Sequence, residues 1–224
     1  MTVHRRLALG TLASALLACP FAAVDAASPE PRLTVFYVEA PPAKAAATLA
    51  ALQAQARDAR KAGASAADAL SESGRPTRMA LVEQWRDLSA AEADRRAKAL
   101  QARLAPQSQA PIDDRLSDPI VPLDFKPAPA GAFHVLMHID VMPDGSATAR
   151  AAVIAQKASV MAAPGALAFD AASQVGRPNH FAVHEAWKTR AAYEACVASP
   201  AGQDLRRQLD RFKGAPFDDR LYGP

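Results

Sequence analysis

The sequence predicts an α+β fold built from two ferredoxin-like repeats in one chain of 224 residues. The block GRPTRMALVEQW at 74–85 recurs as GRPNHFAVHEAW at 176–187, with six of the twelve positions identical. A second block, APIDDRL at 110–116, recurs as APFDDRL at 215–221. Each half also begins with a strand-like run. Self-similarity at such a spacing indicates a duplicated domain.

The elements of the second half read β-α-β-β-α-β. A Pro-Asp-Gly-Ser break separates the first strand from the first helix, and Gly-Arg-Pro-Asn has the chemistry of a hairpin turn. Thr189 is a suitable N-cap for the second helix, and Pro200 fits the first position of its continuation. The sequence therefore predicts strands at 133–141, 166–175, 181–187 and 217–222, with helices at about 148–161 and after 189.

The first half follows the same order, from a strand at 33–39 to a capping box at 89–92 that begins its second helix. This is the split βαβ pattern, whose four-stranded sheet has helices on one face only. Two copies can cover each other's open faces. We expect a first domain at 32–118, a proline-rich linker at 119–131 and a second domain at 132–224.

Residues 1–26 have the pattern of a secretory signal peptide. His4-Arg5-Arg6 precedes an apolar run from Leu7 to Ala18, and Val24-Asp25-Ala26 offers a cleavage site. We therefore expect a periplasmic or secreted protein that starts near Ala27. An alternative is a lipoprotein acylated at Cys19, because Leu16-Leu17-Ala18-Cys19 resembles a lipoprotein box.

The composition argues against some partners. Without residues 1–26 the chain has 24 basic and 22 acidic side chains, scattered among one another, so we expect no nucleic-acid partner. No later segment is long and apolar enough to span a membrane. One cysteine, Cys196, then remains, which excludes a disulfide within the chain.

Four histidines form two i,i+4 pairs on predicted strands: His134 with His138, and His180 with His184. On a strand, i and i+4 share a face, so all four can project from the face opposite the helices. Such a set would suit proton transfer, a divalent metal or haem, although no carboxylate or cysteine completes a recognisable metal spacing. The alternative is a set of polar side chains that fill a wet groove between the halves.

A set of residues in the second half has a recognisable spacing: Asn179, Phe181, Val183, Glu185, Trp187, Ala191, Ala192, Ser199, Pro200 and 216–222. Through these residues the second half resembles the antibiotic biosynthesis monooxygenase (ABM) family, including its quinol monooxygenase branch. The resemblance implies a dimeric α+β barrel, with a pocket between sheet and helices that works on electron-rich aromatics with O2 and no bound cofactor. A family histidine nine residues after the tryptophan is replaced by Cys196 here.

These observations lead to the hypothesis of an exported, cofactor-independent monooxygenase that binds a small quinol or phenolic molecule in the second half. His184 or His138 would be the base, and Asn179 would orient an oxygen. His134, His180 and Trp187 would line the substrate, although Trp187 also fits a core role. The alternative is a non-enzymatic or stress-related module that binds a small ligand, haem or metal. The halves would form a pseudo-dimer, which leaves room for further homo-oligomers.

Overall fold

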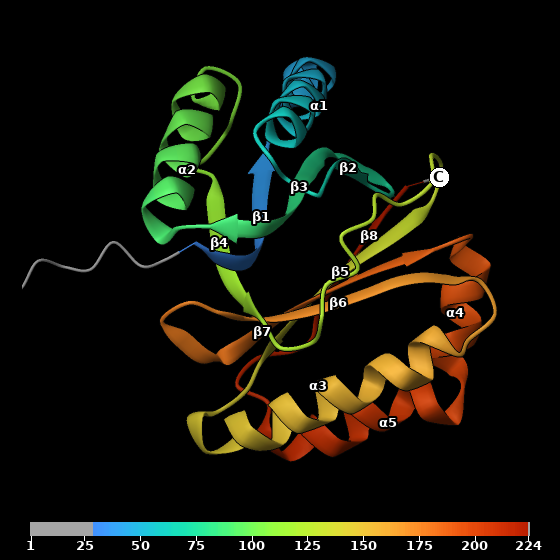
Figure 1. Ribbon diagram of the computed structural model, residues 1–224. Coiled ribbons are helices and arrows are strands. Elements are labelled where there is room, and N and C mark those ends of the chain that lie inside the picture. Colours follow the sequence, from blue (N-terminus) through green and yellow to red (C-terminus); the bar gives the residue numbers. More distant parts are fainter. Residues whose placement is uncertain (1–28, 224) are drawn as a thin grey trace, which may run out of the picture.

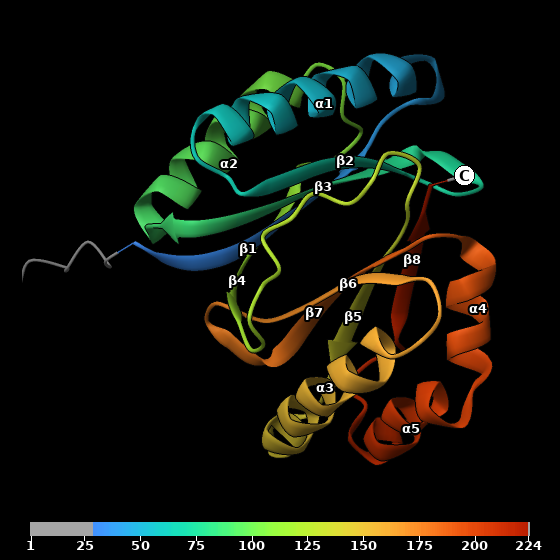
Figure 2. The same cartoon turned by 45° about the vertical axis from the view of Figure 1, so that its right-hand side comes forward.

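The computed structural model describes residues 29–223, and in it eight strands close into one antiparallel barrel. Figures 1 and 2 show two curved sheets that face each other, with helices only on the outer sides. The predicted α+β pseudo-dimeric barrel is confirmed. The signal-peptide and lipoprotein predictions fall outside the described residues, and no helix within 29–223 is long and apolar enough to cross a membrane.

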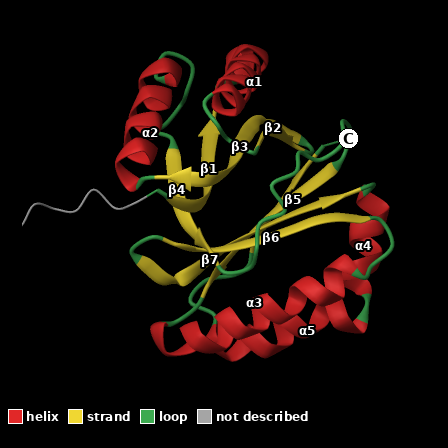
Figure 3. Cartoon of the chain, viewed as in Figure 1, coloured by secondary structure: helices red, strands yellow, loops and turns green. Residues whose placement is uncertain are grey.

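Each half has the expected β-α-β-β-α-β order (Figure 3). The second helix of the second half is broken into α4 (Arg190–Ala198) and α5 (Pro200–Leu209). Pro200 has no N–H to continue α4, and the Ser199 hydroxyl caps α5 by accepting from the backbone N–H of Gly202. The first half comprises β1 (Glu30–Glu39), α1 (Ala45–Lys61), β2 (Ala66–Glu72), β3 (Arg75–Leu88), α2 (Ala90–Leu104) and β4 (Asp113–Pro119). The second comprises β5 (Phe133–Asp140), α3 (Ser146–Met161), β6 (Ala166–Gln174), β7 (Arg177–Trp187), α4 (Arg190–Ala198), α5 (Pro200–Leu209) and β8 (Asp218–Tyr222).

The barrel order is β1-β3-β2-β8-β5-β7-β6-β4, so the two halves meet at two seams. At one seam β4 and β6 pair over three residues, from Ser117 opposite Gln174 to Pro119 opposite Ala172. At the other seam a single pair, Glu72 opposite Tyr222, joins β2 to β8. The second seam is therefore the looser one.

Side chains alternate between a helix-covered face and the barrel interior, as the strand period requires. On β5, Phe133, Val135, Met137 and Ile139 belong to the core under α3–α5. The intervening Leu136 belongs to a separate interior cluster that both halves share. This interior cluster contains Leu33, Val35, Tyr37, Leu70, Ala80, Val82, Leu136, Ala172 and Tyr222.

Candidate functional site

A chain of three polar side chains crosses the barrel interior of the second half. Nδ1 of His134 lies 3.1 Å from Nε2 of His184, and the two rings stack with centroids 5.4 Å apart. Nδ1 of His184 lies 3.2 Å from Oδ2 of Asp170, which is fully buried. We call Asp170, His184 and His134 the relay.

Two further groups hold Asp170 in place. The Gln84 side-chain amide on β3 donates from Nε2 to Oδ2 over 2.6 Å, and the backbone N–H of Asp124 donates to Oδ1 over 3.3 Å. Oε1 of Gln84 accepts from the backbone N–H of Phe125, which fixes the orientation of this amide. The first half and the connecting segment therefore help to build a site whose histidines come from the second half.

The network determines which nitrogens carry protons. Three N–H groups converge on Asp170, an arrangement that suits a carboxylate acting only as an acceptor. His184 then donates from Nδ1, so its Nε2 accepts from Nδ1 of His134. Nε2 of His134 is left as an acceptor. Burial, with a smaller contribution from His184, lowers the pKa of His134 to about 3, so the resting imidazole is neutral at physiological pH.

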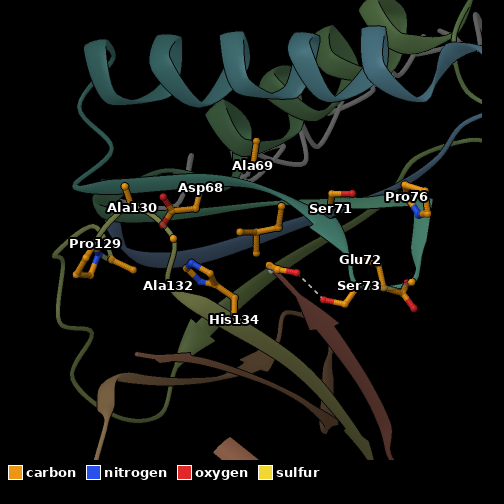
Figure 4. Close-up of a pocket in the computed structure, with 15 residues that line it drawn as sticks. Asp68, Ala69, Ser71, Glu72, Ser73, Pro76, Pro129, Ala130, Ala132 and His134 are labelled. Atoms are coloured by element: carbon orange, nitrogen blue, oxygen red, sulfur yellow. Dashed lines mark hydrogen bonds between the residues drawn. The ribbon is translucent and has the colours of Figure 1, made fainter. Parts of the chain in front are cut away.

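The relay opens into a cavity with a volume of about 580 Å³ (Figure 4). His134 lies at one end of this cavity near Asp68, Pro129, Ala130 and Ala132, whereas Glu72 and Ser73 lie at the other end. The cavity lies at the loose β2–β8 seam, so the first half provides much of its wall.

Asp68 is the first-half counterpart of Asp170. Asp68 is opposite Val82 in the β2–β3 pair, and Asp170 is opposite His184 in the β6–β7 pair. Likewise Leu33 is opposite Gln84, and His134 is opposite Ala186. The first half therefore keeps the carboxylate but has Val82 and Leu33 where the second half has its two histidines.

His138 and His180 are not part of the relay. Nδ1 of His138 accepts a hydrogen bond from Nη1 of Arg115 over 3.0 Å, and Nε2 of His138 is hydrogen-bonded to the hydroxyl of Tyr37. Burial, then Arg115 and Arg220, lower the pKa of His138 to about 3. His180 lies at the barrel rim, with Nδ1 2.9 Å from Oδ1 of Asp140. The four histidines thus form separate groups, of which only His134 reaches the cavity.

Asn179 and Trp187 point away from the relay, because they lie on the opposite parity of β7. Nδ2 of Asn179 donates to the carbonyl of Val141 over 2.7 Å and so ties the end of the hairpin to the segment after β5. Trp187 is fully buried in the core under α3–α5, where its ring contacts Tyr193 edge-on. The structure therefore places neither residue beside His184 or in the cavity.

Comparison with known proteins finds a family match in the second half. The family model described as antibiotic biosynthesis monooxygenase matches residues 132–208. The second half is therefore similar to the ABM family over these residues. No curated protein sequence matches the chain.

The whole chain, with both halves, is similar to several solved structures. Two are proteins described as a "putative monooxygenase": one from Lactobacillus acidophilus (TM-score 0.68, 12% identity, covering 86% of this chain and 93% of that one) and one from Fusobacterium nucleatum (0.72, 14%, 87% and 92%). A third is an anthrone oxidase-like protein (0.65, 15%, 88% and 92%). At these identities the likeness shows a shared fold.

The helix-covered face of the second half holds another, much smaller cavity, where the family resemblance leads one to expect a pocket. Its volume of about 20 Å³ is enough for about one water molecule. Glu185, Tyr193, Cys196 and Arg206 are among its lining residues. This face of the second half is therefore nearly closed.

Glu185 has an electrostatic feature that sequence reasoning missed. Its first-half equivalent, Glu83, accepts hydrogen bonds from Nε1 of Trp85 and from Nη2 of Arg96, the latter over 3.1 Å. Glu185 keeps the tryptophan contact, to Nε1 of Trp187 over 2.8 Å, but makes no ion pair among the described residues. Burial raises the pKa of Glu185 to about 7. The signal was available: counted from the helix N-caps Ser89 and Thr189, Cys196 occupies the position that corresponds to Arg96.

The raised pKa of Glu185 predicts that its own contribution to stability falls as pH rises. The folded state holds a proton that the unfolded carboxyl releases near its ordinary value of 4.5. Relative to Glu185→Gln, the wild-type chain should thus lose about 3 kcal/mol of unfolding free energy between about pH 4.5 and 7. Denaturant unfolding of both proteins across this range measures the effect; an unchanged slope in the variant would contradict it.

Proposed function

We propose that this protein is a monooxygenase that oxidises a small quinol or phenol in the cavity at the β2–β8 seam. The observation that supports it is the Asp170–His184–His134 relay, which ends on a free acceptor nitrogen in a cavity of about 580 Å³. That volume lies within the usual range for sites of drug-sized ligands. The ABM family match over residues 132–208 and the fold shared with an anthrone oxidase-like protein favour this reaction class.

The relay suits removal of a hydroxyl proton. Nε2 of His134 accepts the substrate proton while Nδ1–H of His134 passes its own proton to Nε2 of His184. The positive charge then rests on His184 beside Asp170, and His134 returns to its neutral form. This transfer matters because the pKa of His134 is about 3, so the protonated form of His134 is unstable at neutral pH.

The quinolate formed in this way is electron-rich enough to reduce O2 directly. One electron passes to O2, the two radicals combine at a ring carbon, and the O–O bond then breaks. One oxygen atom stays on the ring and the other leaves as water, so quinol plus O2 gives a hydroxyquinone plus water. The quinol supplies all four electrons, and the reaction needs no bound cofactor.

Oxygen uptake by the purified protein tests this function. We expect consumption of O2 with at least one member of a panel of quinols and phenols, in the presence of a chelator. Under ¹⁸O2 the quinone product should gain one labelled oxygen atom. Folded protein that consumes no O2 with any panel member would overturn the proposal.

We also propose that the mature protein is exported after cleavage near Ala27, because residues 1–26 have the signal-peptide pattern. Mass spectrometry of the protein from the periplasm or medium should give a chain that starts near Ala27. A lipid-modified chain that starts at Cys19 would instead support the lipoprotein alternative.

A further inference from the structure

We infer that the substrate of this cavity carries a cationic amine, which binds Asp68, in addition to the hydroxyl that faces His134. The inference rests on the proposed function and names its substrate class: an aminoalkyl phenol or quinol. It is supported by the charge of the cavity wall, by the missing partners of Asp68 and by the placement of both groups at one end of the cavity.

The cavity wall carries negative charge without a matching positive one. Its lining residues include two carboxylates, Asp68 and Glu72, and no lysine or arginine. The nearest imidazole, His134, is neutral and presents an acceptor nitrogen. Oε2 of Glu72 is buried without a hydrogen-bond partner, and Oε1 lies 3.8 Å from the exposed Arg75. A wall of acceptors favours a ligand that brings donors, above all a charged one.

Asp68 lacks the partners that its counterpart has. Asp170 accepts from His184, Gln84 and a backbone N–H, whereas Asp68 makes no hydrogen bond or ion pair with any of residues 29–223. The reason lies in the sequence. Val82 is the first-half equivalent of His184, and Ala186 is the second-half equivalent of Gln84, so neither can hydrogen-bond Asp68 as His184 and Gln84 hydrogen-bond Asp170. The first half thus holds a carboxylate that receives no hydrogen bond or ion pair from residues 29–223.

The surroundings of Asp68 make this charge costly without a ligand. Burial raises the pKa of Asp68, and only His184 and Arg60 act in the opposite direction. Arg60 is engaged elsewhere, because its Nη1 donates to the carbonyl of Ala67. A bound ammonium would compensate the carboxylate directly, and the half-buried position strengthens such a pair relative to one at the surface.

The geometry allows one small molecule to reach both groups. Asp68 on β2 and His134 on β5 lie at the same end of the cavity, beside Pro129, Ala130 and Ala132 (Figure 4). Leu70 follows Asp68 on the same face of β2 and provides an apolar wall for a ring. His134 is only 6% exposed, so its free nitrogen faces the cavity and not bulk water.

A matched pair of ligands tests the inference: dopamine and 4-ethylcatechol, which share the catechol ring but differ in the ammonium group. By titration calorimetry we expect the wild-type chain to bind dopamine about tenfold more tightly, which corresponds to about 1.4 kcal/mol. Asp68→Asn should abolish this preference and leave the affinity for 4-ethylcatechol unchanged. Asp140→Asn, which removes a carboxylate at the barrel rim, should keep the preference.

The outcomes separate this inference from the proposed function. Equal binding of both ligands by the wild-type chain, or a preference that survives Asp68→Asn, would overturn the amine site while oxygen uptake could still support the oxygenase. If the chain consumes no O2 with any substrate, with or without an amine, the proposed function itself is overturned. If Asp68→Asn fails to fold, Asp68→Ser replaces it, and the wild-type preference must also weaken as salt is raised.

Discussion

Replacement of His134 by glutamine is expected to lower the turnover of the best quinol by about 10²- to 10⁴-fold, the usual contribution of a positioned proton acceptor. Glutamine can still hydrogen-bond the substrate but cannot accept its proton. The loss should therefore appear in kcat, with KM little changed. Oxygen uptake at saturating substrate measures it, and His180→Gln at the barrel rim is the control, because His180 lies outside the relay.

Asp170→Asn should produce a comparable loss without touching the cavity. Asparagine can still accept from Nδ1 of His184 and Nε2 of Gln84, but it has no negative charge to stabilise a protonated His184. The proton that His134 passes on would then lack its counter-ion. A relay that acts only as a structural polar cluster would leave kcat unchanged in both variants, and that result would remove His134 from the mechanism.

The second large effect concerns stability. Glu83→Gln is expected to destabilise the chain by about 3–5 kcal/mol, because it leaves the buried Arg96 guanidinium without its carboxylate. The side chains of Glu83 and Arg96 are 1% and 13% exposed, so water can replace little of the lost interaction.

The duplication supplies the control for this experiment. Glu185→Gln makes the same substitution at the equivalent position, where no arginine is left unpaired, and should not destabilise the chain at pH 8. Chemical denaturation of the two variants at that pH compares them directly. Equal losses of unfolding free energy in both would contradict the role assigned to Arg96.

Much of the fold could be predicted because the repeat shows each element twice. The alternation of Phe133, Val135, Met137 and Ile139 with His134, Leu136 and His138 defines the two faces of β5, and the structure follows that alternation. The break between α4 and α5 also has a visible cause in Pro200. Local periodicity and capping chemistry are enough for these features.

The site was less predictable, because it depends on which strands become neighbours in the closed barrel. Parity placed the histidines on the interior face but could not show that His184 contacts His134 while His138 contacts Tyr37. Gln84 comes from the other half, and no local pattern marks it as a partner of Asp170. The same parity could have excluded Asn179 and Trp187 from the histidine face, since both alternate with His184 on β7.

The unequal treatment of Asp68 and Asp170 has an evolutionary consequence. In a dimer of identical subunits every substitution appears on both sides of the two-fold axis, so a histidine gained beside one aspartate is gained beside the other. A fused chain is free of that constraint. It can use Asp170 in proton transfer and leave Asp68, the equivalent residue, free to bind a charged group of a ligand. The two ends of one small molecule can then be recognised by residues that descend from one ancestral position.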